Sequence, residues 1–296
     1  MAATEVTETA LAWVAGAVGS PWARTVRRLA GGTHALTHVV ETGDPTRAWV
    51  LRRFPPGDGA AAREARVLTA LDGLDGRAPR LAAADPEGAR TGAPATLVTL
   101  LPGRADLAPA APETAAAALG LALAHAHARP LADLASLPEA LPALPRGEAG
   151  AAGPAVAAHG ARLAGSAHVM THYDYWSGNV LWEGGALTGI VDWSGGGLAP
   201  RGHDVSWCRL DLALLYGAPA ADAFLAAYER EARTVTPDLG LWDLSAVARS
   251  HTTVESWRAN YGQLGRADLD GPALRSRHTA WTSELIGRNR ELMVRS

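Results

Sequence analysis

The sequence contains a single cysteine, Cys208, and no lysine, so all 27 basic residues in its 296 positions are arginines. One cysteine excludes an intramolecular disulfide, and we therefore expect a cytoplasmic protein in a reducing environment. Residues 1–19 lack the basic start and continuous apolar run of a signal peptide. No stretch of about eighteen apolar residues is free of charge and proline, so no membrane-spanning segment is expected.

An excess of charge of one sign is also missing. The formal net charge is −3, and the arginines are scattered along the chain rather than clustered. Neither nucleic acid nor an acidic membrane surface is therefore expected as a partner. A chain of this length with 48% hydrophobic residues can bury a substantial core and fits one large or two modest domains.

One stretch of the sequence carries a pattern typical of phosphoryl transfer. His172-Tyr-Asp174-Tyr-Trp-Ser-Gly-Asn179 is followed by Val191-Asp192-Trp193. In kinases an Asp of the catalytic loop accepts the proton of the attacking hydroxyl, and an Asn five residues later and a further Asp hold magnesium. Asp174 is accordingly the candidate base. Asn179 and Asp192 are the candidate Mg²⁺ ligands, because this hard cation prefers oxygen donors and keeps several waters.

The residues between these two candidate ligands favour a β-hairpin. Residues 180–182 and 187–191 form two short apolar runs on either side of Glu183-Gly-Gly185, which is a turn signal. A hairpin displays both of its ends to one side. We therefore expect Asn179 and Asp192 to be brought together.

Residues 169–212 resemble the aminoglycoside phosphotransferase and choline kinase superfamily of small-molecule kinases. In this family the loop commonly reads H-G-D-x-x-x-x-N, and the metal-binding Asp sits in I-D-W. Tyr173 stands where the family usually has Gly, and Tyr175-Trp176 stands where many members have Leu-His. The resemblance also implies that Asp204, in Pro200-Arg-Gly-His-Asp204, is a structural residue that braces the catalytic loop, with His172 as further structural support.

The resemblance implies an α+β, bilobal, protein-kinase-like fold. Residues 1–102 would form a nucleotide-binding N-lobe built on an antiparallel sheet, with a hinge at about 98–103. Residues 103–296 would form a mainly helical C-lobe with the catalytic loop and the acceptor-binding helices. Helices are expected over residues 60–71, 113–127, 205–216, 220–233, 241–261 and 272–293. Residues 130–154 are expected to be a loose, variable insert near the acceptor cleft.

Several N-lobe residues correspond to family positions that bind nucleotide. Gly31 and Gly32 would let backbone amides approach the phosphates. Arg52 takes the place of the strand lysine that grips the α- and β-phosphates, and Glu64 would pair with it. Arg53, on the opposite face of that strand, is expected to be solvated. The backbone of the hinge residues would face the purine; these residues are Thr99, Leu100 and Leu101.

The activity implied by the resemblance is Mg²⁺-dependent transfer of the γ-phosphate of ATP or GTP to a hydroxyl of a small molecule. The leading acceptor is an antibiotic such as an aminoglycoside; choline, sugar or homoserine acceptors are alternatives, as is a nucleotide-binding pseudokinase without catalysis. Trp176, Asp211 and Glu255 are candidate acceptor contacts. Asp222 and Asp243 are further candidates, and for all four acidic residues a solvated helix face is the competing interpretation.

Overall fold

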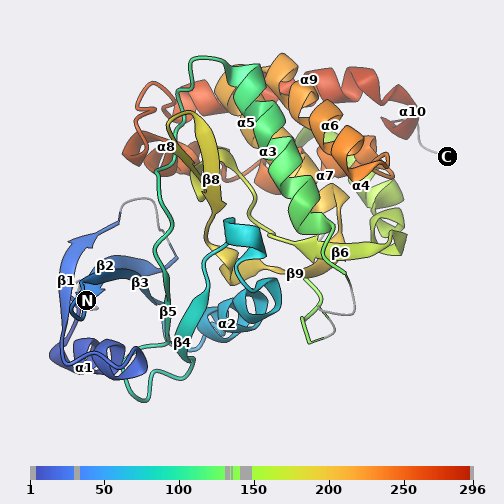
Figure 1. Cartoon of the computed structure of the whole chain (residues 1–296). Helices are drawn as coiled ribbons and strands as arrows, with labels where there is room; N and C mark the ends of the chain where they lie inside the picture. Colours follow the sequence, from blue (N-terminus) through green and yellow to red (C-terminus); the bar gives the residue numbers. More distant parts are fainter. Residues whose placement is uncertain (1–4, 30–33, 131–133, 135, 141–148, 294–296) are drawn as a thin grey trace. The chain divides into compact units, whose positions relative to one another are not determined.

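An antiparallel five-stranded sheet forms the centre of the N-terminal part of the protein (Figure 1). The computed structural model describes residues 5–29, 34–130, 134, 136–140 and 149–293. The chain divides into two compact units, which are described separately: unit 1 comprises residues 1–104 and 181–196, and unit 2 comprises residues 105–180 and 197–296. In the part of the chain that the structure describes, no helix is both long and apolar enough to cross a bilayer.

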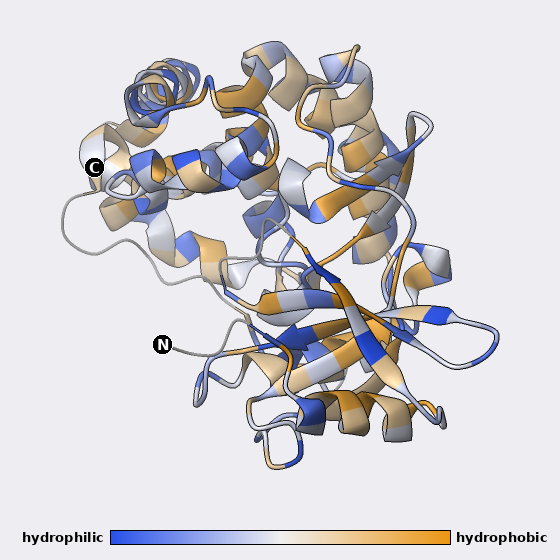
Figure 2. Cartoon of the chain, turned by 90° about the vertical axis from the view of Figure 1, so that its left-hand side faces the viewer, coloured by the Kyte–Doolittle hydropathy of each residue, from blue (hydrophilic) through white to orange (hydrophobic). Residues whose placement is uncertain are grey.

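The sheet of unit 1 has the strand order β1-β2-β3-β5-β4, and every neighbouring pair is antiparallel. Its strands are β1 (Ala23–Arg28), β2 (Leu36–Thr42), β3 (Arg47–Arg53), β4 (Leu81–Asp85) and β5 (Ala95–Thr99). Helix α1 (Glu8–Ala17) packs on the sheet through Trp13 and Val14, which share a buried apolar cluster with Leu51 and Leu97. Figure 2 shows that α1 is largely hydrophobic and that the strands carry both hydrophobic and hydrophilic residues.

Helix α2 (Ala60–Leu71) spans the residues predicted from the sequence. Its buried residues recur at helical spacing, with Glu64, Val67, Leu68 and Leu71 on one face. Asp58 assists the start of the helix, because its Oδ1 accepts a hydrogen bond from the backbone N–H of Ala60 at 2.7 Å. The short 3₁₀ segment η1 (Leu74–Gly76) follows the helix.

The predicted hairpin is present as β7 (Val180–Glu183) and β8 (Ala186–Ile190), which form a two-stranded sheet. Gly184 and Gly185 make its turn with φ values of 58° and 82°, which glycine adopts without steric cost. Apart from Val180, the hairpin belongs to unit 1, whereas the contiguous lobes expected from the sequence place it in the second lobe. It is held there by pairing of Trp182 with Arg104 and by the Thr188 hydroxyl, which donates to the carbonyl of Pro102 at 2.7 Å.

Unit 2 is mainly helical. Its helices are α3 (Pro112–His127), α4 (Gly153–His159), α5 (Gly202–Tyr216), α6 (Ala218–Ala232), α7 (Leu239–Ser250), α8 (Arg258–Gln263), α9 (Gly271–Arg288) and α10 (Arg290–Met293). Strands β6 (His168–Thr171) and β9 (Gly197–Pro200) pair antiparallel. The 3₁₀ segments of unit 2 are η3 (Gly150–Ala152), η4 (Gly160–Gly165), η5 (Ser177–Asn179) and η7 (Val254–Trp257). A further 3₁₀ segment, η6 (Trp193–Gly195), belongs to unit 1.

Two of the predicted helices are interrupted. The predicted helix over residues 241–261 is broken into α7, η7 and α8, because the chain turns after Ser250 and the carbonyl of His251 accepts from the Arg275 guanidinium. The predicted helix over residues 272–293 breaks at Asn289, which separates α9 from α10. Helix α9 begins at a regular N-cap, where Asp270 accepts from the backbone N–H of Ala273 at 2.8 Å.

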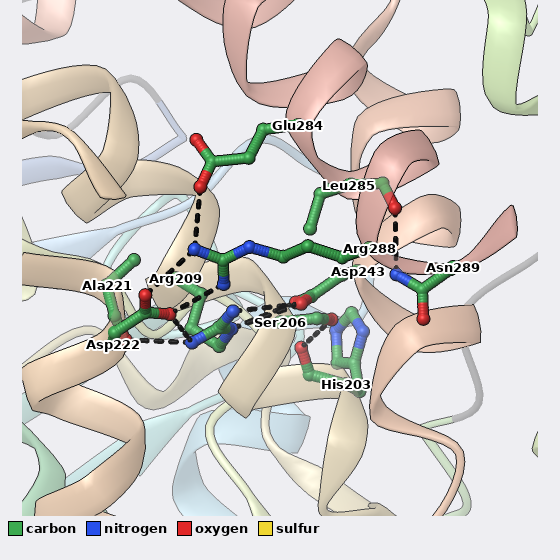
Figure 3. A network of polar contacts seen from close by, with 10 residues as sticks. All are labelled: His203, Ser206, Arg209, Ala221, Asp222, Asp243, Glu284, Leu285, Arg288 and Asn289. Atoms are coloured by element: carbon green, nitrogen blue, oxygen red, sulfur yellow. Dashed lines mark hydrogen bonds and ion pairs between the residues drawn. The ribbon is translucent and has the colours of Figure 1, made fainter. Parts of the chain in front are cut away.

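A partly buried polar network connects four helices of unit 2, α5, α6, α7 and α9 (Figure 3). Arg209 on α5 pairs with Asp243 on α7, and both side chains are at most 3% exposed. Arg209 also reaches Asp222 at 3.3 Å, and Arg288 on α9 binds the same carboxylate at 2.9 Å. Asp243 is therefore the buried partner of an ion pair. It is neither a solvated residue on a helix face nor an acceptor contact, the two interpretations considered from the sequence.

Candidate functional site

The loop that follows β6 is fixed at its start by a buried carboxylate. Asp204 is fully buried, and its two oxygens accept hydrogen bonds from the backbone N–H groups of His172, at 2.6 Å, and Tyr173, at 2.8 Å. His127 Nε2 lies 3.2 Å from Asp204 Oδ2. Burial acts to raise the pKa of Asp204, but the His127 hydrogen bond and the nearby histidines lower it below its ordinary value. Asp204 is thus an ionised anchor for the loop.

Tyr173 has a backbone conformation that glycine usually supplies. Its φ is 75°, in the left-handed region, which costs a residue with a side chain about 1–2 kcal/mol. Its ring packs against His203 with the two centroids 4.7 Å apart, and its carbonyl accepts a hydrogen bond from His203 Nε2 at 3.0 Å. These contacts explain how a bulky residue is held at a position where the resembling family usually has Gly.

Asp174 follows directly and is exposed to solvent. Its Oδ1 accepts a hydrogen bond from the indole N–H of Trp207 at 3.0 Å. The Asn179 amide donates to the backbone carbonyl of Asp174 at 2.9 Å and lies 3.4 Å from its Oδ2. Asn179 is 9% exposed, and its N–H₂ group faces Asp174, so its carbonyl oxygen is directed elsewhere. The structure therefore brings Asp174 and Asn179 together in one loop.

A pocket in unit 2 opens beside Asp174 and holds about 420 Å³ of empty space, including its open mouth. Three indole rings and two carboxylates contribute to its walls. The lining residues are Asp174, Trp176, Trp207, Asp211, Trp257, Asn260 and Tyr261. Asp174 is therefore an exposed carboxylate at the wall of a mainly aromatic pocket, where it can meet a small molecule.

Asp211 has a buried carboxylate that is satisfied by the protein itself. It is 3% exposed and accepts from the backbone N–H of Ser177 at 2.9 Å, the Ser177 hydroxyl at 2.6 Å and the Tyr261 hydroxyl at 2.8 Å. Burial raises its pKa above the ordinary value, although these donors act in the opposite direction. It links the Ser177 end of the loop after β6 to Tyr261 on α8.

The candidate acceptor contacts predicted from the sequence are placed differently. Trp176 and Asp211 line the pocket with Asp174. Glu255 does not belong to the lining residues and instead binds the Arg275 guanidinium through both carboxylate oxygens, at 2.5 and 2.7 Å. The lining residues Asn260 and Tyr261 were not singled out from the sequence, because they come from α8 and reach the pocket only through tertiary packing.

In unit 1, Arg52 on β3 lies between two carboxylates. Its Nε is 3.2 Å from Glu64 Oε1 on α2, and its Nη2 is 2.5 Å from Asp192 Oδ1 after β8. Glu64 is 1% exposed and also accepts from the Thr96 hydroxyl at 2.6 Å. Burial raises the pKa of Glu64, whereas it lowers that of Arg52; the two carboxylates outweigh this and raise the pKa of Arg52. Arg52 is therefore a charged arginine held by two elements.

Arg53 is not solvated as predicted. Its side chain is 8% exposed, and burial lowers its pKa. The prediction is wrong because both faces of β3 are covered at this end of the strand, which also pairs with β2 and β5. Four successive residues of this strand end, Val50 to Arg53, are buried, so both faces of the strand are covered there.

Asp192 occupies a tight turn after the hairpin. Its φ is 66°, a conformation that Asp tolerates better than most residues. Its Oδ1 also accepts from the Ser194 hydroxyl at 2.7 Å, and the following Trp193 is buried and donates its indole N–H to the carbonyl of Ile190 at 2.9 Å. The carboxylate is thus fixed to the end of β8.

The two predicted magnesium ligands lie on either side of the hairpin in sequence, Asn179 in unit 2 and Asp192 in unit 1. One amide oxygen and one carboxylate are suitable donors for Mg²⁺, which completes its octahedron with phosphate and water oxygens. The donor chemistry of these two residues therefore fits the ion, and their joint action remains a prediction.

The remaining nucleotide-binding candidates lie in or near the sheet. Thr99 ends β5, where its hydroxyl accepts from the backbone N–H of Arg80 at 2.9 Å. Leu100 is 38% exposed. Leu101 packs closely against Gly189, because a Cβ added at position 189 would lie 2.5 Å from the Leu101 side chain. The predicted glycine turn, Gly31 and Gly32, falls outside the described residues.

Comparison with known proteins gives a family match for most of the chain. Residues 25–242 match the model of a family described as the phosphotransferase enzyme family. No curated protein matches the chain.

Among solved structures, a candidate aminoglycoside phosphotransferase from Ralstonia eutropha JMP134 is similar at 16% identity and a TM-score of 0.64, over 96% of this chain and 98% of that one. Macrolide 2'-phosphotransferase MphH from Brachybacterium faecium is similar at 19% identity and a TM-score of 0.52, over 92% and 96%. A mutant of aminoglycoside phosphotransferase APH(4)-Ia, in complex with ADP and hygromycin B, is similar at 14% identity and a TM-score of 0.56, over 93% and 98%. At these identities the likeness concerns the fold, which is the protein-kinase-like fold predicted from the sequence.

Proposed function

Because the chain belongs to the phosphotransferase enzyme family, we propose that it transfers the γ-phosphate of ATP or GTP to a hydroxyl of a small molecule. One observation carries this proposal beyond the family: Asp174 is exposed at the wall of a pocket whose other walls are aromatic and polar. A carboxylate in this position can meet an acceptor hydroxyl and take its proton.

In the proposed reaction the acceptor hydroxyl oxygen attacks the γ-phosphorus while its proton passes to the Asp174 carboxylate. The bond from the γ-phosphorus to the bridging oxygen breaks, and the nucleoside diphosphate leaves with those electrons. Asn179 and Asp192 would hold Mg²⁺, which when bound neutralises charge on the phosphates. Catalysis would depend mainly on positioning and charge neutralisation.

The nucleotide would be bound by unit 1. Arg52 would contact the α- and β-phosphates and would be kept in place by Glu64. Gly31 and Gly32 would bring backbone amides to the phosphates, and the backbone of Thr99, Leu100 and Leu101 would face the purine. These roles follow from the family resemblance and from the place of Arg52 between its two carboxylates.

For the acceptor we propose an antibiotic such as an aminoglycoside. Trp176 and Asp211 would contact it in the pocket, and the hygromycin B bound by one structural neighbour supports an antibiotic acceptor. Choline, sugars and homoserine are the alternative acceptors, because the same loop chemistry serves any hydroxyl compound that fits the pocket.

The test is a transfer assay with the purified chain, Mg²⁺ and either ATP or GTP. The acceptor panel contains aminoglycosides, macrolides, choline, sugars and homoserine, and mass spectrometry detects any acceptor that gains a phosphoryl group. A phosphorylated acceptor that forms only with Mg²⁺ and nucleotide supports the proposal. Nucleotide binding without any phosphorylated product, across the panel and in a bacterial resistance screen, would instead support a pseudokinase.

A further inference from the structure

The indole of Trp207 makes a directed contact with the proposed base. Trp207 is the sixth residue of α5 and is half-buried, and its Nε1–H donates to Asp174 Oδ1 at 3.0 Å. An indole has one polar hydrogen and can only donate. The bond therefore selects one oxygen of the carboxylate and limits rotation of the Asp174 side chain.

The Trp207 ring is itself held from two sides. The guanidinium carbon of Arg249, on α7, lies 5.2 Å from the ring centroid, within the range of a cation–π contact. The ring of Trp257 meets that of Trp207 edge to face, with the centroids 5.3 Å apart and an interplanar angle of 66°. Two independent contacts thus oppose a change in the orientation of the indole.

Arg249 also reaches the backbone that carries Asp174. It donates to His203 Nδ1 at 3.1 Å, and His203 Nε2 donates to the carbonyl of Tyr173 at 3.0 Å. These two bonds require a neutral His203 with its proton on Nε2. Arg249 therefore connects the indole that contacts the carboxylate with the peptide just before Asp174.

We propose that Trp207 is a positioning residue for the base. By binding Oδ1 it orients the Asp174 carboxylate in the pocket that both residues line, so that Oδ2 is the oxygen that receives the proton of the acceptor hydroxyl. The proposal rests on the proposed function, since a base needs positioning only if the chain transfers a phosphoryl group. It assigns to Trp207 a role distinct from packing and from contact with the acceptor.

Trp207→Phe keeps an aromatic ring between Arg249 and Trp257 but removes the N–H donor. We expect kcat to fall by about 10- to 100-fold, with a smaller change in the KM for the acceptor, because a misoriented base affects the chemical step. Trp257→Phe is the matched control: it lines the same pocket and also contacts Trp207, but gives no indole N–H to Asp174. We expect it to act mainly on the KM for the acceptor. A kcat for Trp207→Phe within about twofold of the wild type would overturn the proposal.

The indole proton of Trp207 gives a second readout that does not depend on turnover. In proton–nitrogen NMR spectra its resonance is assigned by its disappearance in Trp207→Phe. In Asp174→Ala we expect this resonance to move upfield, because a charged acceptor is lost. The indole proton of Trp193, which donates to the carbonyl of Ile190, should stay in place. A Trp207 resonance that does not move would contradict the contact and overturn the proposal.

The two readouts separate the proposal from the function on which it rests. If the wild type phosphorylates no acceptor, the proposed function fails, and a positioning role in catalysis fails with it. The indole resonance still reports whether the Trp207–Asp174 bond exists. If the wild type is active and the resonance moves, but kcat is unchanged in Trp207→Phe, the function stands and the positioning role is overturned.

Discussion

Arg52 donates a hydrogen bond to Asp192, with Nη2 2.5 Å from Oδ1, across 140 positions of sequence. The same guanidinium lies beside the buried Glu64, so one arginine satisfies two acidic groups on different elements. A planar fork can serve two carboxylates at once, whereas a lysine ammonium acts as a point charge. In a chain without lysine, Arg52 thus links β3, α2 and the turn after β8.

Loss of Arg52 should destabilise the protein strongly. Arg52→Ala leaves the Glu64 carboxylate buried without its cation, and we expect the free energy of unfolding to fall by about 3–5 kcal/mol. Arg52→Ala combined with Glu64→Gln should recover part of this loss, because the buried charge is then removed. Urea denaturation of the two variants measures the difference, with the exposed Arg47→Ala on the same strand as the control. Equal stability of the single and double variants would contradict this account.

Asp204→Asn should loosen the start of the loop after β6. An amide offers one acceptor oxygen where the carboxylate offers two, so one of the backbone N–H groups of His172 and Tyr173 loses its partner. We expect the free energy of unfolding to fall by about 1–3 kcal/mol. Thermal denaturation of the variant and the wild type measures this loss. Asp268→Asn, in an exposed ion pair with Arg266, should leave the unfolding midpoint nearly unchanged. A similarly small change for Asp204→Asn would argue against its anchoring role.

At position 173, a glycine variant should be more stable than an alanine variant. Tyr173→Gly and Tyr173→Ala both lose the ring contact with His203, so their difference isolates the backbone strain at φ 75°. We expect the glycine variant to be more stable by about 1–2 kcal/mol, the reverse of the order found at helical positions. Chemical denaturation of this pair of variants is the measurement. An alanine variant as stable as the glycine variant would show that the conformation is not strained.

Acid should destabilise the fold through His203. Burial first, and then the charge of Arg249, lower the pKa of His203 from its ordinary value to about 4, while Asp204 opposes the shift. His127 and the carbonyl of Tyr173 are its other polar neighbours. On lowering the pH, His203 of the unfolded chain takes up a proton near pH 6.5, whereas His203 of the folded chain does not. The contribution of His203 to stability is therefore fully present above pH 6.5. It then falls as the pH drops to about 4, by about 3 kcal/mol in total.

His203→Gln, which cannot titrate, should reduce this slope of stability between pH 6.5 and 4. His278, whose pKa is also lowered to about 4, should preserve part of it. Denaturation curves of the wild type and the variant at several pH values provide the comparison. An unchanged slope in His203→Gln would mean that His203 is not a source of the pH dependence.

Local sequence patterns predicted the parts of the site that local structure builds. The limits of α2, the hairpin of residues 180–190 and the nearness of Asp174 to Asn179 all follow from spacing within short segments. The pocket was harder to predict, because Trp207 lies on α5, Trp257 on η7 and Tyr261 on α8, and only packing brings them together. The burial of Arg53 likewise depends on the covering of both faces of β3, which the alternation within one strand does not reveal.

The most direct test of the account is the rate of phosphoryl transfer by Asp174→Asn. The amide can still accept the Trp207 indole N–H but cannot take a proton from the acceptor. We predict that the transfer rate measured with Mg²⁺, nucleotide and the acceptor found for the wild type falls by at least about 100-fold. Fluorescence titration measures the nucleotide affinity of the variant, which should stay close to that of the wild type. The control variant Asp268→Asn should also keep the nucleotide affinity of the wild type. Full activity in Asp174→Asn would contradict the central claim that Asp174 is the base.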